Sequence, residues 1–218
     1  VDFTGVTIDY NLTSITGSSD EVTFNLVNMA EIDVDTDGIE TVNLVAKAGA
    51  GSATTDIVGI AASTVTNGTV NVSGADGDDD VTLDTIASGY TTVSATGLTG
   101  DLTIGLAARG STAMTITGGT GSDSIAMENA SDVLDGGTKT GTSDTLVLGG
   151  TYSTGGITID LTSTGDQVTV FNGAANSAVQ KGFEAVDLSA ATFNAGGATI
   201  TEGDTAQTIK GTNKADTI

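Results

Sequence analysis

The 218-residue sequence predicts an all-β fold, an elongated solenoid of the parallel β-helix or β-roll type, with turns rich in glycine and aspartate. Three observations carry this prediction. Short segments alternate apolar and polar residues, a glycine–aspartate turn recurs along the chain, and 31 residues are glycine whereas only 4% are aromatic. So few large apolar side chains suit a thin aliphatic core, in which each coil packs mainly on its neighbours.

The alternating segments are short and recur along the whole chain. Two of them are residues 22–26 and 157–161, where β-branched residues dominate and Gly, Asn, Ser or Asp stand on either side. A period of two is typical of β-strands with one buried face, and the flanking residues favour tight turns. We therefore predict strands at residues 6–8, 22–26, 42–44, 70–72, 102–104, 114–116, 157–161 and 168–170.

An eight-residue turn frame, Gly-x-x-x-x-Asp-x-aliphatic, occurs three times. Its best copy is residues 118–125, and the others are residues 74–81 and 211–218. The frame continues in tandem after the best copy, because Asp132 and Asp144 each stand two positions before a leucine. Repeats of short strands and turns indicate a solenoid.

A second repeat has a longer wavelength. Residues 38–44 and 182–188 share the pattern Gly-(Ile/Phe)-Glu-x-Val-x-Leu. Each copy follows a similar alternating segment, at residues 20–24 and 166–170 respectively. This repeat also favours a solenoid, because it returns the same strand and turn at a distant position in the chain.

The composition excludes several classes of chemistry. The chain has 28 acidic and 6 basic residues, a formal net charge of -22, and neither histidine nor cysteine. It therefore lacks the residues for a Ser-His-Asp triad, a thiol redox centre or a nitrogen- and sulfur-ligated zinc site. So acidic a chain should repel nucleic acids and anionic membranes, and no apolar run is long enough for a transmembrane helix. Oxygen ligands instead favour calcium.

The turn frame suits calcium for a physical reason. Glycine lets carbonyl oxygens turn inward, and aspartate supplies a hard anionic oxygen. Residues 76–80 hold four aspartates, whose repulsion a cation would relieve, although a solvated acidic turn is the alternative. In the last copy of the frame, Lys214 replaces an expected glycine and disfavours calcium. The candidate metal ligands are Gly119, Gly121, Asp123, Asp132, Gly137, Asp144, Asp76, Asp78, Asp79, Asp80 and Asp216.

Two other acidic patterns have weaker functional interpretations. Residues 33–38 imitate the start of an EF-hand loop, but Leu44 stands where the bidentate glutamate belongs. We favour a solvent-facing acidic strand there over a calcium bridge at a molecular contact. Paired carboxylates could also serve a glycosidase, but the chain offers no set of acid, base and substrate-binding residues. We therefore expect no enzymatic activity.

On these residues the chain resembles the calcium-binding surface-layer proteins of Gram-negative bacteria and related RTX-repeat secreted matrix proteins. The frame at 118–125 carries the specific likeness, since it matches the RTX pattern Gly-Gly-x-Gly-x-Asp-x-aliphatic. The repeats at 38–44 and 182–188, and the Ser-Ala and Thr-rich stretches before each aspartate turn, are similar but less specific. The tandem departs from the family at residues 127–130, which contain no glycine.

The resemblance implies a calcium-bridged parallel β-roll. It implies that the turn of Gly119, Gly121 and Asp123 stacks on the turn of Gly137 and Asp144, with Asp132 on the other side. It further implies type I secretion, by a signal not seen in this chain, and calcium-dependent folding outside the cell. Independently of the family, calcium that binds the folded turns better than the open chain would stabilise the fold.

Two functions follow as expectations. The first is a structural protein that self-associates into a surface layer or extracellular matrix at the bacterial cell surface. The alternative is an adhesin or a module that binds lipopolysaccharide or another cell-surface glycan. We expect three segments, a β-rich segment at 1–72, the calcium-binding solenoid at 73–148 and a further β-rich segment at 149–218, and a longer parent chain.

Overall fold

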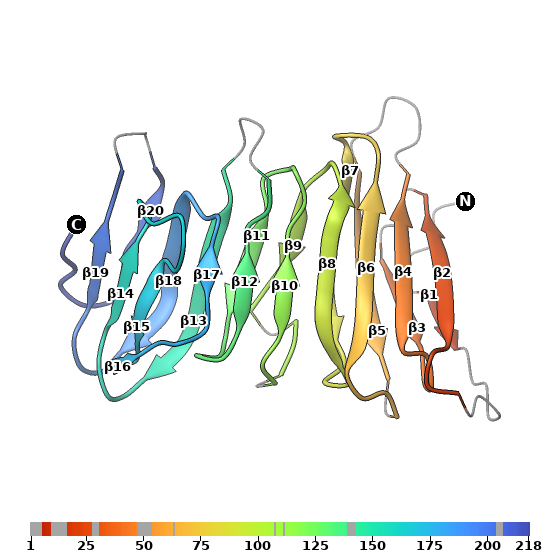
Figure 1. Cartoon of the computed structure of the whole chain (residues 1–218), viewed down its shortest axis with the longest axis horizontal. Helices are drawn as coiled ribbons and strands as arrows, with labels where there is room; N and C mark the ends of the chain where they lie inside the picture. Colours follow the sequence, from red (N-terminus) through yellow and green to blue (C-terminus); the bar gives the residue numbers. More distant parts are fainter. Residues whose placement is uncertain are drawn as a thin grey trace.

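The computed structural model describes residues 6–9, 17–27, 31–47, 54–62, 64–106, 108–110, 112–138, 143–203 and 207–218. In these residues the chain is all-β, and two long parallel sheets lie face to face (Figure 1). Successive strands alternate between the two sheets, so the chain winds as a flattened coil along the long axis of the molecule. The predicted parallel solenoid of the β-roll type is confirmed.

Within the described residues, the first sheet has nine strands and the second has seven, while a third sheet of four strands lies near the C-terminal end. The nine-stranded sheet is β1 (Val6–Asp9), β3 (Ile32–Asp35), β5 (Thr54–Ala61), β7 (Asp79–Ile86), β9 (Leu102–Ile104), β11 (Ser124–Met127), β13 (Thr145–Tyr152), β18 (Ala185–Phe193) and β20 (Ile209–Lys210). The seven-stranded sheet is β2 (Glu21–Leu26), β4 (Thr41–Ala46), β6 (Gly68–Gly74), β8 (Tyr90–Leu98), β10 (Thr115–Thr117), β12 (Val133–Asp135) and β17 (Gln180–Lys181). The third sheet is β14 (Ile157–Asp160), β15 (Val168–Phe171), β16 (Ala174–Ala175) and β19 (Ala198–Thr201).

The alternating residues form the core as the sequence predicts. In β4 and β6 every second side chain is buried, and the parallel register places Val42 beside Val70. The row continues through Val93 and Ile116 to Leu134, so like side chains stack coil upon coil. Each such side chain contributes about 1.5–3 kcal/mol by leaving water. Every predicted segment coincides with a strand, and the ends agree to within two residues.

The solenoid makes one excursion, between β13 and β18. After β14 the chain reverses into antiparallel β15 and β16, then rejoins the seven-stranded sheet as β17 beside β12. Two buried glutamines fix this excursion. The side chain of Gln167 donates to the carbonyl of Phe183 (2.8 Å) and accepts from its N–H (2.9 Å), and the side-chain amide of Gln180 donates to the carbonyl of Asp132. Strands β13 and β18 still pair directly across the excursion.

The expected segment boundaries fall inside regular structure. Strand β6 runs across residue 72 and strand β13 across residue 148, and each pairs with a strand on both sides. The acidic stretch at residues 33–35 belongs to β3, where Asp33 is exposed and the neighbouring Ile32 and Val34 are buried. Asp33 thus faces solvent on a strand as predicted, whereas Asp35 is half-buried and Asp37 is half-buried beyond the end of β3.

A buried tyrosine joins three successive coils. The hydroxyl of Tyr90 donates to the carbonyl of Ile39 (2.7 Å) and lies 2.8 Å from the hydroxyl of Thr36, which donates to Ala61 (3.1 Å). Its ring packs on Gly68, where an added Cβ would overlap the ring. Burial raises the pKa of Tyr90 to about 12 although the hydrogen bond with Thr36 acts to lower it, so the hydroxyl stays protonated.

We predict that Tyr90→Phe lowers the free energy of unfolding by about 1–3 kcal/mol, because the carbonyl of Ile39 loses this hydrogen bond and the hydroxyl of Thr36 loses one of its two partners inside the core. Urea denaturation followed by circular dichroism measures this. Tyr152→Phe is the matched control: its hydroxyl donates to the carbonyl of Gly149 (2.7 Å) beside an open cavity that water can enter, so a smaller loss is expected. Equal losses would contradict a special role for Tyr90.

Candidate functional site

The acidic and glycine-rich residues gather where the chain passes between the two sheets. We call the turns from the seven-stranded to the nine-stranded sheet the glycine corner, whose described residues are 27, 31, 47, 75–78, 99–101, 118–123, 136–138 with 143–144, and 182–184. The turns in the other direction form the opposite corner, whose described residues are 17–20, 36–40, 62 with 64–67, 87–89, 105–106 with 108–110, 112–114 and 128–132. The two corners lie at opposite edges of the flattened coil.

Close stacking explains the glycines of the best turn frame. A Cβ on Gly121 would overlap the carbonyl of Gly100 in the preceding coil, and one on Gly137 would overlap the carbonyl of Gly119. Gly137 also has a φ of 114°, which side-chain-bearing residues rarely adopt. The N–H of Thr138 donates to the carbonyl of Gly119 (2.9 Å). The turn of Asp123 therefore stacks on the turn of Asp144, as the family resemblance implies.

The buried carboxylates of the glycine corner accept hydrogen bonds from the coil before them. Asp123 accepts from the N–H of Leu102 (2.8 Å) and, through its other oxygen, from Gly119 in its own turn (2.7 Å). Asp144 accepts from the N–H of Asp123 (2.8 Å). Both aspartates are 1% exposed. Each of these carboxylates thus caps backbone N–H groups at the point where one coil passes onto the next.

The four-aspartate turn divides into an inner and an outer pair. Asp79 is buried and accepts from the N–H of Asp76 (2.9 Å), whereas Asp80 accepts from the N–H of Asp101 in the following coil (2.8 Å). Asp76 and Asp78 are exposed, and their only mutual hydrogen bond is long, from the N–H of Asp78 (3.4 Å). The outer pair therefore directs its carboxylates into solvent.

At the opposite corner, Asp132 has an internal cation as its partner. Its carboxylate is wholly buried and accepts from both terminal nitrogens of Arg109, at 3.0 and 2.6 Å. It also accepts from the N–H groups of Met114 (3.0 Å), Glu128 (3.0 Å) and Asn129 (2.9 Å). The guanidinium of Arg109 thus supplies a cationic partner beside this buried carboxylate.

The second repeat gives two glutamates the same capping role. Glu184 accepts from the N–H of Asp144 (3.0 Å), and Glu40 accepts from the N–H of Asp20 (2.9 Å). In both copies the glycine, Gly38 or Gly182, has a φ near 78°, and the following Ile or Phe is buried. The pattern Gly-(Ile/Phe)-Glu is therefore a corner motif that works at either edge of the coil.

The last turn frame uses the same hydrogen bonds. Asp216 accepts from the N–H of Ala198 in the preceding coil (2.7 Å) and from Thr212 in its own turn (2.8 Å). Burial acts to raise the pKa of Asp216, but these hydrogen bonds outweigh it and the pKa is lowered. The pKa of Asp187 is lowered in the same way, because hydrogen bonds from Lys210 and Ser189 outweigh the effect of burial. For Asp123 burial is the larger effect, and its pKa is raised.

One acidic pair that the sequence does not predict lies on the outer face of the nine-stranded sheet. Side-chain oxygens of Asp33 and Asp84 both approach the place where Gly59 lacks a Cβ. Both side chains are exposed. In the part of the chain that the structure describes, no three acidic side chains are grouped so that they could hold a metal. Asp33 and Asp84, and the outer pair Asp76 and Asp78, have the oxygen chemistry and solvent access that calcium needs.

Comparison with protein-family models, with curated proteins and with solved structures finds no match for this chain. None of its described segments is a helix that could span a membrane.

Sequence reasoning missed the roles of Arg109, Glu40 and Glu184. Arg109 is the chain's only arginine and belongs to no repeat, so its pairing with Asp132 leaves no local pattern. The glutamates do leave one, because both copies of the second repeat keep glutamate two residues after glycine. A glutamate kept at the same position in both copies is the signal that could have indicated this role.

We predict that Arg109→Met lowers the free energy of unfolding by about 3–5 kcal/mol, because Asp132 would remain buried with its charge unpaired. Lys210→Met is the control: its ion pair with Asp187 is also short (2.7 Å) but the lysine is 59% exposed, so the loss should be about 0–1 kcal/mol. Chemical denaturation measures both. If the two losses were equal, the buried pair would not hold the corner.

We also predict that lowering the pH from neutral raises the melting temperature. Because the pKa of Asp123 is raised, the folded state binds the proton of this carboxyl more readily than the unfolded state does. Protonation of Asp123 therefore stabilises the fold at low pH, and this stabilisation is lost as the pH rises. Asp187 and Asp216 have the opposite sign, and their contribution is lost below the usual carboxyl range of about 4. Stability should therefore pass through a maximum in mildly acidic solution. Asp123→Asn should flatten the rise, and a steady fall from neutral pH would contradict it.

Proposed function

We propose that the chain is a non-catalytic structural module of an extracellular bacterial assembly: a β-solenoid, stabilised by calcium, that self-associates into a surface layer or matrix. The observation that carries the proposal is an uncharged face on a strongly acidic rod. Strands β4, β6, β8 and β10 contain no charged residue. Copies that each carry a net charge of -22 repel, and this face offers the contact with least repulsion.

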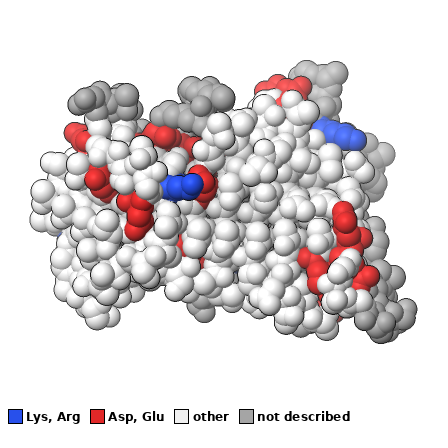
Figure 2. Space-filling view, in the orientation of Figure 1, with Lys and Arg blue, Asp and Glu red and all other residues white. Residues whose placement is uncertain are grey.

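The uncharged face is regular as well as neutral. It presents rows of threonine, asparagine and serine in register, and neighbouring coils are linked by a hydrogen bond from Asn71 to Asn43 (2.9 Å). Figure 2 shows this side, where acidic atoms lie mainly towards the ends and margins and the middle carries none. The opposite sheet differs, because Asp33, Asp84 and Asp187 lie on its strands. A flat, neutral, periodic surface suits packing against an identical surface.

In this proposal the exposed carboxylates are the ligands of calcium. The carboxylates that cap the corners are mostly buried, so the exposed pairs are the residues that would hold an ion: Asp76 with Asp78 in one turn, and Asp33 with Asp84 on the nine-stranded sheet. When bound, calcium would neutralise charge that opposes both folding and the approach of a second copy. At a free calcium concentration one hundred times the Kd, one such site would add about 2.7 kcal/mol to the free energy of unfolding.

A second candidate function is a glycan-binding module, such as an adhesin. It is favoured by one cavity, of about 420 Å³, whose wall includes Tyr152 and Glu128. An aromatic ring beside a carboxylate suits a hydroxylated ligand.

We predict that calcium raises the melting temperature and drives the protein into sheets or filaments, and that EDTA reverses both effects. Circular dichroism and negative-stain electron microscopy measure these, with magnesium as the ionic control. Thr92→Asp, at the centre of the uncharged face, should block assembly while calcium still raises the melting temperature. Thr103→Asp, a matched outward threonine on the other sheet, should assemble normally. Monomeric particles at high protein concentration with calcium would overturn the proposal.

A further inference from the structure

A cavity of about 320 Å³ lies at the opposite corner, between the turns that precede strands β6, β8 and β10. We call it the Asn67 cavity. None of the residues that line it is charged, although the chain as a whole has a net charge of -22. The coil thus brings neutral residues from three distant parts of the sequence to one place, and the wall includes Val65, Thr66, Asn67, Ser88, Thr91 and Thr112.

Close packing between two turns gives the Asn67 cavity a fixed floor. The N–H of Gly68 donates to the carbonyl of Gly89 (2.9 Å). A Cβ on Gly89 would overlap the carbonyl of Val65, and one on Gly68 would overlap the ring of Tyr90. Asn67 has a φ of 58°, a conformation that asparagine adopts more readily than most residues. Because the turns are already ordered, a ligand would not have to order them on binding.

A β-bulge adds Thr91 to the wall. In the pairing of β6 with β8, Gly68 stands opposite Tyr90 but Thr69 stands opposite Thr92, so Thr91 is an extra residue. Bulges of this kind redirect side chains and are common beside binding sites. The bulge therefore supplies the cavity with a hydroxyl from within a strand.

The polar side chains of the wall have hydrogen-bonding capacity to spare. Short polar side chains in turns often bond to nearby backbone groups, as Asn129 does with the N–H of Ser131 (2.9 Å) and Ser163 with that of Gly165 (3.3 Å). In the Asn67 cavity five such side chains form no hydrogen bond with another described residue: Thr66, Asn67, Ser88, Thr91 and Thr112. Their donors and acceptors are therefore available to a ligand.

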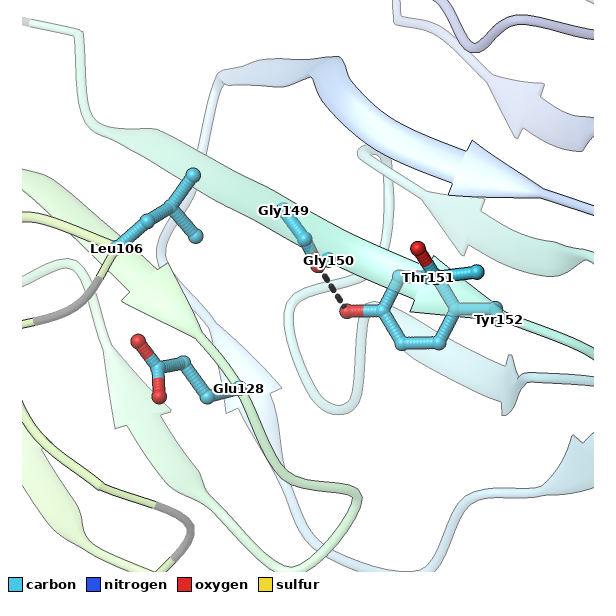
Figure 3. Close-up of a pocket in the computed structure, with 6 residues that line it drawn as sticks. All are labelled: Leu106, Glu128, Gly149, Gly150, Thr151 and Tyr152. Atoms are coloured by element: carbon cyan, nitrogen blue, oxygen red, sulfur yellow. Dashed lines mark hydrogen bonds between the residues drawn. The ribbon is translucent and has the colours of Figure 1, made fainter.

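The cavity beside Tyr152 differs in this respect (Figure 3). There the hydroxyl of Tyr152 already donates to the carbonyl of Gly149 (2.7 Å), and Glu128 already has a partner within the chain. The Asn67 cavity leaves more of its polar groups to a ligand.

The chemistry of the wall selects an uncharged, hydroxylated ligand. A hydroxyl and a side-chain amide each donate and accept, so they complement the hydroxyl groups of a sugar. The wall offers no charged partner to a carboxylate, a phosphate or an ammonium group. Val65 and the methyl groups of the threonines supply apolar contact, as the walls of small-molecule sites usually do.

We propose that the Asn67 cavity binds a neutral sugar residue of a glycan. The amide of Asn67 would bond to two neighbouring hydroxyls of the ring, and the hydroxyls of Ser88 and Thr91 would bond to others. The apolar face of the ring would lie against Val65. This inference rests on the second candidate function, glycan binding, and is independent of calcium and self-association. It adds the class of sugar and the place where it binds.

An NMR titration of the isotope-labelled protein tests the proposal. The probes are the methyl glycosides of glucose, galactose and mannose, with glucuronate as the anionic arm. At least one neutral glycoside should shift the amide signals of residues 65–68 and 88–91 in a saturable manner. Glucuronate should bind at least about tenfold more weakly than that glycoside, because the wall offers no cation and the chain is strongly acidic.

Asn67→Gly tests the wall itself. Glycine keeps the positive φ but removes the amide, so the Kd of the glycoside should rise about tenfold. Asn172→Gly is the matched control, because Asn172 also has a positive φ (50°) but lies between β15 and β16. This control should bind as the parent does. Thr91→Val keeps the shape of the side chain and removes its hydroxyl, so it should weaken binding about threefold. Unchanged circular dichroism spectra establish that the variants fold.

The outcomes separate this inference from the functions on which it stands. Equal affinity in the parent and Asn67→Gly, or glucuronate that binds as tightly as the neutral glycosides, would overturn it. A glycoside that shifts signals only elsewhere in the chain would remove this site and keep glycan binding. A protein that binds none of the three glycosides but forms sheets in calcium would overturn the sugar site and leave the assembly function intact.

Discussion

The structure depends on one contact that recurs at its corners: a carboxylate that holds the backbone N–H of an adjacent coil. Within a strand the parallel ladder pairs every N–H, but at a corner the chain leaves one sheet and its N–H groups lose that partner. Asp123, Asp144 and Glu184 supply acceptors in three consecutive coils at one edge. Asp132 does the same at the other edge for Met114. These side chains fix the register of each coil on its neighbour, while the aliphatic rows between them supply the burial.

Several parts of this arrangement could be predicted from sequence, because they depend on local pattern. Alternation marks strands such as β4 and β14, and the family resemblance of the frame at 118–125 implied the stacking of its turn on the turn at Asp144. The excursion between β14 and β17 could not be predicted, since residues 168–170 alternate like any other strand although β15 runs antiparallel to β14. The cation beside Asp132 could not be predicted either, because Arg109 comes from a coil 23 positions earlier and pairing at that distance leaves no spacing rule.

The glycine–aspartate frame has two physical explanations that the sequence alone does not separate. Glycine is needed where a corner carbonyl of one coil touches the next, as at Gly121, and equally where carbonyls surround an ion. Aspartate can accept from N–H groups or ligate a cation. The direction in which the carboxylate oxygens of each aspartate point distinguishes the stacking explanation from the ion-binding explanation. In Asp123 both oxygens hold N–H groups inside the coil, whereas Asp76 and Asp78 are exposed in the same kind of turn. The frame is thus primarily a device for stacking coils, and the calcium binding proposed above would fall to its exposed carboxylates.

The separation of buried corner carboxylates from exposed ones limits which surfaces of so acidic a chain could contact a second copy. The inner carboxylates hold backbone N–H groups within the corners. A contact surface between copies must therefore either neutralise the exposed acidic side chains or contain none. The chain has no charged residue on strands β4, β6, β8 and β10, where threonine, serine and asparagine are the polar residues. Those residue types also have the β-branched or hydrogen-bonding side chains that stabilise neighbouring strands in register. The same choice of residues therefore keeps the sheet regular and leaves one broad surface on which electrostatic repulsion between identical molecules is weakest.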